Sequence, residues 1–144
     1  MWWYFARVTN PIQLTDSASN TLVIEPDAGC VATSWRVNDR EVLALPSPRE
    51  EFLRSSRTGG VPLLYPYANR LRSDHFQVAG RAVNLSVDAK LKRDSTGLPI
   101  HGLLLRWSEW NLNQPSPGRL EASIRWSDHP PLMAAYTFDH TLKV

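Results

Sequence analysis

An asparagine–arginine pair, Asn69-Arg70, and a histidine further along the chain, His101, carry the side chains best suited to binding a polar ligand. An arginine presents five donors in a planar fork, an asparagine amide both donates and accepts, and an imidazole does either according to its tautomer. Such a set suits the ring and hydroxyl oxygens of a polyol, or a carboxylate. These three residues are therefore candidate binding residues.

The loop that leads into the asparagine–arginine pair, residues 58–68, has the composition of a stiff and irregular path. Gly59 and Gly60 permit a positive φ or a close backbone approach, whereas Pro62 and Pro66 fix φ and lack an amide donor. These residues argue against a helix. We expect a loop, held by neighbouring strands, to position the pair.

The rest of the chain reads as β structure, because apolar residues alternate with polar ones and turn residues separate the runs. Strands are predicted at residues 12–25 with a turn at 16–20, at 31–37 and 41–45 with a turn at 38–39, and at 76–81, 83–87, 103–110, 120–126 and 136–144. Loops are predicted at 46–57 with a helical turn over 49–54, at 89–99, at 114–118 and at 127–131. The fold class that follows is all-β, an antiparallel β-sandwich.

Several motifs keep a common order and spacing along this chain. They are GGVPLLYP at 59–66, Asn69-Arg70, Phe76 with Gly80, Ile100-His101-Gly102 and Trp110, preceded by IEPDAGC at 24–30 and Ser34-Trp35-Arg36. Together they resemble the aldose 1-epimerase (galactose mutarotase) family. The resemblance covers about residues 12–144, the first half of a typical member, and leaves residues 1–11 as an N-terminal extension.

The resemblance implies the first half of a large, curved β-supersandwich, with a hexose in a groove crossed by side chains. A mutarotase interconverts α and β anomers by taking the proton of the anomeric hydroxyl and protonating the ring oxygen. By resemblance, Arg70 would bind the sugar near its ring oxygen, and Asn69 would support Arg70 or contact the sugar. His101 would be the catalytic residue, contacting a hydroxyl or polarising the reacting centre.

The family's acid, a histidine in a later His-x-Tyr-Phe stretch, and its base, a glutamate near the C-terminus, have no counterpart in these residues. Each such group contributes on the order of 10²–10⁴ in rate. The sequence therefore predicts sugar binding more directly than it predicts activity of the isolated chain. His140, on the apolar face of its predicted strand, is expected to be a partly buried histidine at a strand end.

The same residues also allow other interpretations. Arg70 could pair with Asp74 or Asp88 at the surface, and His101 could be a strand-end histidine satisfied by the backbone. The chain could be a non-catalytic carbohydrate-binding sandwich, or a sugar-phosphate epimerase relative that uses further cations. The arginines available for that last role are Arg57, Arg72 and Arg106.

Composition limits the partners. A net charge of +2 from 16 basic and 14 acidic residues provides no large field for nucleic acid or anionic lipid. The single cysteine, Cys30, excludes an internal disulfide and a cysteine-based zinc site, and we expect neither a metal nor a cofactor. Without a signal peptide or a membrane span in the sequence, a cytoplasmic location is expected. An open edge at residues 136–144 would invite self-association.

Overall fold

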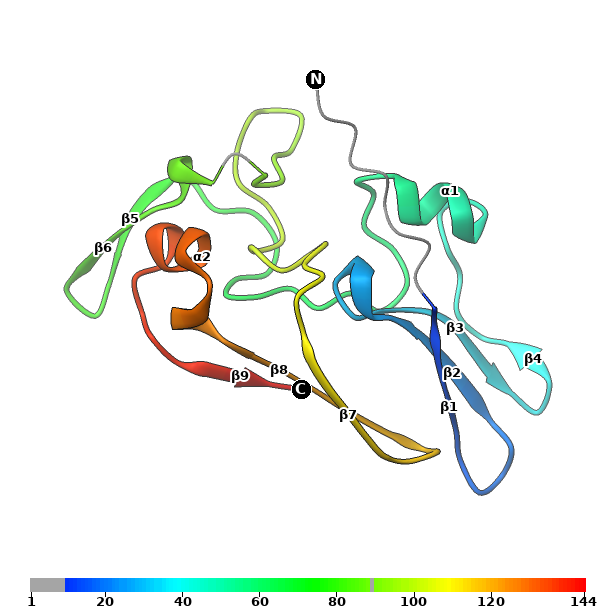
Figure 1. Cartoon of the computed structure of the whole chain (residues 1–144). Helices are drawn as coiled ribbons and strands as arrows, with labels where there is room; N and C mark the ends of the chain where they lie inside the picture. Colours follow the sequence, from blue (N-terminus) through cyan, green and yellow to red (C-terminus); the bar gives the residue numbers. More distant parts are fainter. Residues whose placement is uncertain (1–9, 89) are drawn as a thin grey trace. The chain divides into compact units, whose positions relative to one another are not determined.

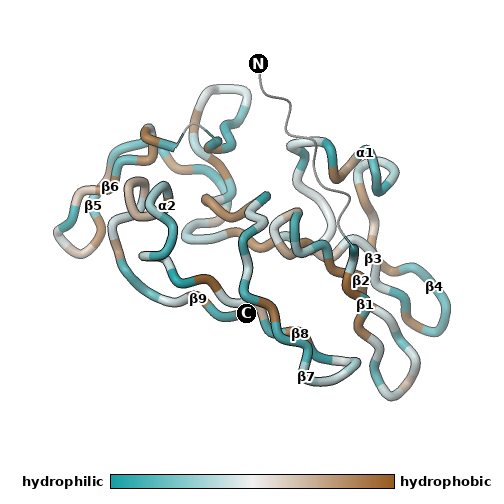
Figure 2. Tube along the Cα trace, in the orientation of Figure 1, coloured by the Kyte–Doolittle hydropathy of each residue, from teal (hydrophilic) through white to brown (hydrophobic). Residues whose placement is uncertain are grey.

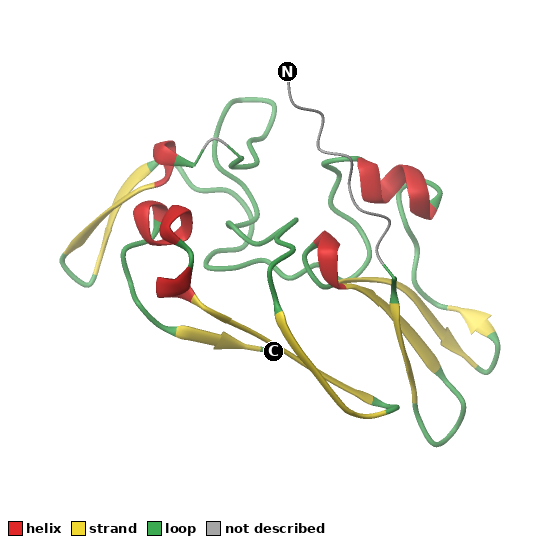
Figure 3. Cartoon of the chain, viewed as in Figure 1, coloured by secondary structure: helices red, strands yellow, loops and turns green. Residues whose placement is uncertain are grey.

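The computed structural model describes residues 10–88 and 90–144, and its regular structure is mostly antiparallel strand with short helices (Figures 1 and 3). The predicted all-β antiparallel class is confirmed. The chain divides into two compact units, one made of the chain up to Leu63 with Leu105–Ala122, the other of Leu64–Leu104 with Ser123–Val144. The predicted extension at 1–11 lies outside the described residues except for its last two positions, so this domain boundary stays a prediction. None of the helices in the described part has the length and apolar character that a membrane crossing requires.

The first unit contains a four-stranded antiparallel sheet. Its strands follow sequence order as β1 (Ile12–Thr15), β2 (Thr21–Glu25), β3 (Val31–Val37) and β4 (Arg40–Glu41). The turn after β1 is closed by the Asp16 carboxylate, which accepts hydrogen bonds from the amides of Ala18 and Asn20, each at 2.9 Å. Both predicted hairpins are therefore confirmed, although β4 is much shorter than the expected strand at 41–45. Figure 2 shows hydrophobic segments along β1 to β3 and a hydrophilic turn before β4.

The core of the first unit lies where the sheet meets a short helix, α1 (Arg49–Arg54). Its buried members are Ala28, Val31 and Phe52, packed against Leu45 and Leu53. The predicted helical turn over 49–54 is confirmed. Between β2 and β3 the chain forms a 3-10 turn, η1 (Pro26–Ala28), and strand β7 (Asn111–Ser116) later runs into β8 (Arg119–Arg125). The turn between β7 and β8 is tighter than the one expected at 114–118.

A buried ion pair ties α1 to the sheet of the first unit. Glu25 at the end of β2 is completely buried, and Arg49 donates to both of its carboxylate oxygens, from Nε at 2.6 Å and from Nη2 at 2.8 Å. The Thr33 hydroxyl on β3 donates to the same carboxylate at 2.9 Å. A charged side chain that is buried away from water needs such partners, because a buried charge without a counter-charge or hydrogen bonds costs several kcal/mol of stability.

The second unit combines a hairpin with the end of a three-stranded sheet. The hairpin consists of β5 (His75–Val78) and β6 (Arg81–Asn84). The three-stranded sheet has the order β7-β8-β9, with β9 (Thr141–Lys143) at its edge. Two 3-10 turns, η2 (Leu85–Val87) and η3 (Trp126–Asp128), and helix α2 (Pro130–Ala135) complete it. The core is formed by Val83, Leu85, Leu91 and Ala135.

Three further predicted strands are wrong, in part or in full. The strand expected at 83–87 ends at Asn84, because that side chain accepts from the amide of Ser86 at 3.0 Å and begins a 3-10 turn that leaves Val87 exposed. The residues expected as a strand at 103–110 form none, although Leu104 and Leu105 are buried.

Helix α2 begins within the loop expected at 127–131 and ends just before the strand expected at 136–144. Its two prolines, Pro130 and Pro131, stand in the first turn, where no intrahelical donor is required. Only Thr141–Lys143 of the strand predicted at 136–144 pairs as a strand.

Replacing Arg49 with methionine should lower the free energy of unfolding by about 2 kcal/mol. The reason is that Glu25 would stay buried without its cation; the effect is smaller than for a wholly buried pair because the Arg49 side chain is 37% exposed. Urea denaturation followed by circular dichroism measures the change. Arg54→Met, on the exposed part of the same helix, is the control, and an equal loss in both variants would contradict the importance of the ion pair.

Candidate functional site

The two motifs singled out in the sequence lie side by side within the second unit. Three backbone hydrogen bonds join residues 65–71 to residues 99–103: Leu71 N to Pro99 O at 2.9 Å, His101 N to Asn69 O at 2.9 Å, and Leu103 N to Tyr65 O at 2.7 Å. Arg70 and Ile100 form an antiparallel bridge between them. The structure therefore brings Asn69, Arg70 and His101 together.

This pairing depends on unusual backbone conformations at the site residues themselves. Asn69 has φ 57° and His101 has φ 69°, in the left-handed region that asparagine tolerates better than most residues. Gly102 has φ 75°, and a Cβ there would lie 2.3 Å from the carbonyl oxygen of Tyr65. The glycine after His101 is thus required for the two segments to approach.

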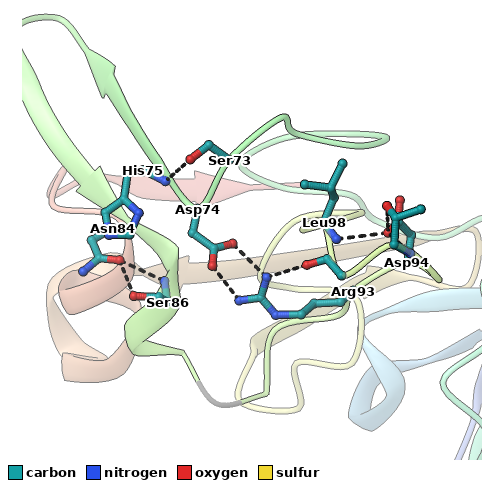
Figure 4. A network of polar contacts seen from close by, with 10 residues as sticks. Ser73, Asp74, His75, Asn84, Ser86, Arg93, Asp94 and Leu98 are labelled. Atoms are coloured by element: carbon teal, nitrogen blue, oxygen red, sulfur yellow. Dashed lines mark hydrogen bonds and ion pairs between the residues drawn. The ribbon is translucent and has the colours of Figure 1, made fainter.

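Arg70 extends toward solvent, with 51% of its side chain exposed, and its Nε donates to Oδ2 of Asp94. Neither Asp74 nor Asp88, the partners considered from the sequence, fills this role. Asp74 instead accepts two hydrogen bonds from Arg93, each at 2.9 Å (Figure 4). Asn69 lies exposed beside Arg70.

Asp94 is a site residue that the sequence reasoning missed. Its Oδ1 accepts from the amide of Thr96 at 2.8 Å, from the Thr96 hydroxyl at 2.7 Å and from the amide of Leu98 at 3.0 Å. These bonds, led by that of the Thr96 hydroxyl and supplemented by Arg70, hold the pKa of the Asp94 carboxyl well below its usual range. The Asp-Ser-Thr-Gly run could have indicated this residue, because an aspartate followed by such residues is typical of a turn that the aspartate side chain closes by hydrogen bonds.

His101 is partly buried, and its surroundings favour the neutral imidazole. Burial, then the positive charges of Lys92 and Arg70, lower the pKa of His101 from its ordinary value of 6.5. Its Nδ1 is buried and has no hydrogen-bond partner within the described residues. The interpretation of His101 as a histidine satisfied by the backbone therefore does not hold for this nitrogen.

A second histidine, His140, is held in a cluster of aromatic rings in the same unit. Its Nδ1 lies 2.6 Å from the carbonyl oxygen of Phe138, and because a carbonyl only accepts, Nδ1 carries the proton. Its Nε2 then accepts from the Tyr65 hydroxyl at 2.7 Å. The ring stacks on the buried Trp126 with centroids 4.9 Å apart. The prediction of a partly buried histidine is confirmed, and Trp126 serves the core.

The further arginines considered for a sugar phosphate differ in their surroundings. Arg106 donates to the carbonyl of Arg57 at 2.7 Å and lies over the ring of Phe52, 4.8 Å from its centroid. Burial lowers the pKa of Arg106. This side chain therefore packs within the first unit, while Arg72 is exposed in the second.

Replacing Gly102 with alanine should destabilise the second unit by on the order of 3 kcal/mol, through a positive φ and a clash with the Tyr65 carbonyl. Gly97→Ala is the matched control, since Gly97 also has a positive φ, 84°, but nothing lies within 4 Å of its Cβ position. It should cost about 1 kcal/mol. Urea denaturation measures the free energy of unfolding of both variants. Equal decreases would show that the close approach at Gly102 does not contribute to stability.

The titration midpoint of His101, followed by NMR, should lie below 6.5 in the folded chain. Between the folded and unfolded pKa values the unfolded chain binds more protons, so this residue makes stability rise with pH and fall on acidification below about 6.5. His101→Asn should remove that part of the pH dependence. A folded midpoint at or above that of the urea-unfolded chain would contradict the prediction.

Comparison with known proteins extends this picture. The family model for aldose 1-epimerase matches residues 12–144, whereas none of the curated proteins matches this chain. The solved structure of the Slr1438 protein from Synechocystis sp. PCC 6803 is similar to it with a TM-score of 0.70 and 23% identity, covering 99% of this chain and 45% of that one.

Two further structures share the fold. A galactose mutarotase-like protein from Clostridium acetobutylicum gives a TM-score of 0.66 at 16% identity, covering 88% of this chain and 38% of that one. A putative aldose 1-epimerase from Escherichia coli K12 gives 0.57 at 22% identity, covering 81% and 36%. The chain thus spans less than half the length of these proteins. Because the family model matches nearly all of its residues, the chain belongs to the aldose 1-epimerase family.

Proposed function

We propose that this chain provides the sugar-binding residues of an aldose 1-epimerase that interconverts the α and β anomers of a hexose. The observation that supports this most is the pairing of Asn69-Arg70 with Ile100-His101 by the bridge and hydrogen bonds described above. Those backbone contacts join two segments that carry a cation, an amide and an imidazole, in a chain of the aldose 1-epimerase family. A sugar bound there would meet donors and acceptors together.

The proposed role of each side chain follows from its hydrogen-bond partners, its protonation and its exposure. Arg70 uses Nε for Asp94 and keeps its two Nη groups for a ring or hydroxyl oxygen. A hydrogen bond from a charged group contributes roughly 1.5–3 kcal/mol. His101, kept neutral at pH 7 by its lowered pKa, would hydrogen-bond a hydroxyl or polarise the reacting centre. The exposed Asn69 would contact the sugar beside Arg70.

Anomer exchange also needs one group to take the anomeric proton and another to protonate the ring oxygen. We assign neither task within these residues, because the His-x-Tyr-Phe stretch expected from the family is not among them. His140 is engaged by Phe138 and Tyr65 and is not assigned as its substitute. This chain's own residues would bind and orient the sugar, and turnover would need an acid and a base in addition.

The second candidate is a carbohydrate-binding sandwich without catalysis, which would bind the sugar with the same residues, Asn69, Arg70 and His101. A sugar-phosphate epimerase is less well supported, because Arg106 is committed to Arg57 and Phe52. The cytoplasmic location stays a prediction from the sequence. Pairing of another chain at the edge strand β9 also stays a prediction.

Titration of the chain with glucose or galactose should shift the NMR signals of residues 69, 70 and 101. Arg70→Ala should weaken binding about 10- to 100-fold, the loss expected for one charged hydrogen bond. Arg72→Ala, which removes an exposed arginine two positions away, is the control and should bind like the unaltered chain.

Polarimetry of the complete protein, in which an acid and a base would also be supplied, then separates the two candidates. An enzyme speeds the approach of an anomer to equilibrium and loses that effect in Arg70→Ala and His101→Ala. A binding protein shows the NMR shifts without any change in rate. Absence of sugar-dependent shifts at these three residues would rule out both.

A further inference from the structure

We propose that Asp94 is a positioning residue of the sugar site, whose carboxylate holds the Arg70 guanidinium with one oxygen and the loop that leads to His101 with the other. The role of this contact in sugar binding rests on the proposed function. The contact between Asp94 and Arg70 itself does not. It concerns how three short segments are locked together before any sugar arrives.

The three segments form a small sheet-like layer. The central one, residues 98–101, pairs on one side with residues 69–71 through Leu71 N to Pro99 O and His101 N to Asn69 O. On its other side it pairs with residues 92–94, through Asp94 N to Leu98 O at 2.9 Å and Ile100 N to Lys92 O at 3.0 Å. Arg70 and Asp94 therefore belong to the two outer segments. Their ion pair links both flanks of the segment that carries His101.

The two oxygens of Asp94 have separate partners. Oδ2 accepts from Arg70 Nε, while Oδ1 accepts from the Thr96 amide, the Thr96 hydroxyl and the Leu98 amide. The Asp94 side chain is 6% exposed, against 51% for Arg70. A nearly buried and fully engaged carboxylate is thus the fixed end of the contact, and the exposed arginine is the end that would otherwise move.

The contact would matter for binding because a long arginine side chain loses rotamer freedom when it grips a ligand. Fixing Nε beforehand leaves the two Nη groups in a set direction, so less ordering accompanies sugar binding. The carboxylate also offsets the charge of Arg70 beside His101. The low pKa of Asp94 keeps it ionised at any pH at which the chain would work.

The test is Asp94→Asn. The asparagine keeps a carbonyl oxygen that can accept from Thr96 and Leu98, whereas its amide nitrogen cannot accept from Arg70 Nε. Asp74→Asn is the matched control, because it removes the carboxylate that pairs with Arg93 in another aspartate–arginine pair of this unit.

The readouts are the Nε–Hε signal of Arg70 in NMR and the affinity for glucose or galactose. In the unaltered, sugar-free chain the Arg70 signal should exchange with water more slowly than that of the exposed Arg72. In Asp94→Asn this protection should be lost and affinity should fall about 3- to 10-fold, the size of one hydrogen-bond contribution. Asp74→Asn should leave both unchanged. In an Arg70→Ala background, Asp94→Asn should have no further effect on affinity.

The proposal is overturned if Arg70 and Arg72 exchange alike in the unaltered chain, a measurement that needs no variant to fold. It is equally overturned if Asp94→Asn, folded by circular dichroism, keeps the Arg70 protection, or binds sugar like the unaltered chain where that chain binds. If the unaltered chain binds no sugar, the proposed function fails, and the Arg70 signal by itself still decides whether Asp94 positions the guanidinium.

Discussion

Backbone pairing between residues 65–71 and 99–103 is the constraint on which the candidate site depends, because it places Arg70 next to Ile100 and His101 next to Asn69. It is possible only because Gly102 lacks a Cβ, which would lie 2.3 Å from the Tyr65 carbonyl. Positive φ angles at Asn69 and His101 then turn each residue out of a regular strand. Positive φ also occurs away from the site, for example at Asn38 and Ala79, so it is not confined to the residues proposed to bind the sugar. Folded proteins commonly retain such backbone strain at functional sites.

Charge is handled differently in the two units. In the first, a completely buried Glu25 is neutralised by Arg49 and so joins a helix to the sheet. In the second, the Arg70–Asp94 and Arg93–Asp74 pairs lie nearer the surface and order loops. The first kind of pair chiefly supports folding, since a buried charge must be compensated. The second kind leaves part of the guanidinium accessible, which a binding residue requires.

The sequence predicted the parts of the fold that depend on neighbouring residues. The turn at 16–20, the turn at 38–39 and the helix at 49–54 follow from short-range chemistry, and each was confirmed. Prediction failed where a local signal competed with another one. Asn84 begins a 3-10 turn within a run that alternates like a strand, and Pro130 and Pro131 begin a helix although proline elsewhere argues against one.

The sequence by itself determined the family, the antiparallel β class and the candidates Asn69, Arg70 and His101. The order of the motifs and the alternation of apolar with polar residues can be read without a structure. It did not determine what these side chains contact. That Arg70 pairs with Asp94 and neither Asp74 nor Asp88, and that Nδ1 of His101 is buried without a partner among the described residues, was decided by the tertiary structure. The physical reason is that hydrogen-bond partners and desolvation depend on which segments meet in space, and such meetings leave little trace in local sequence.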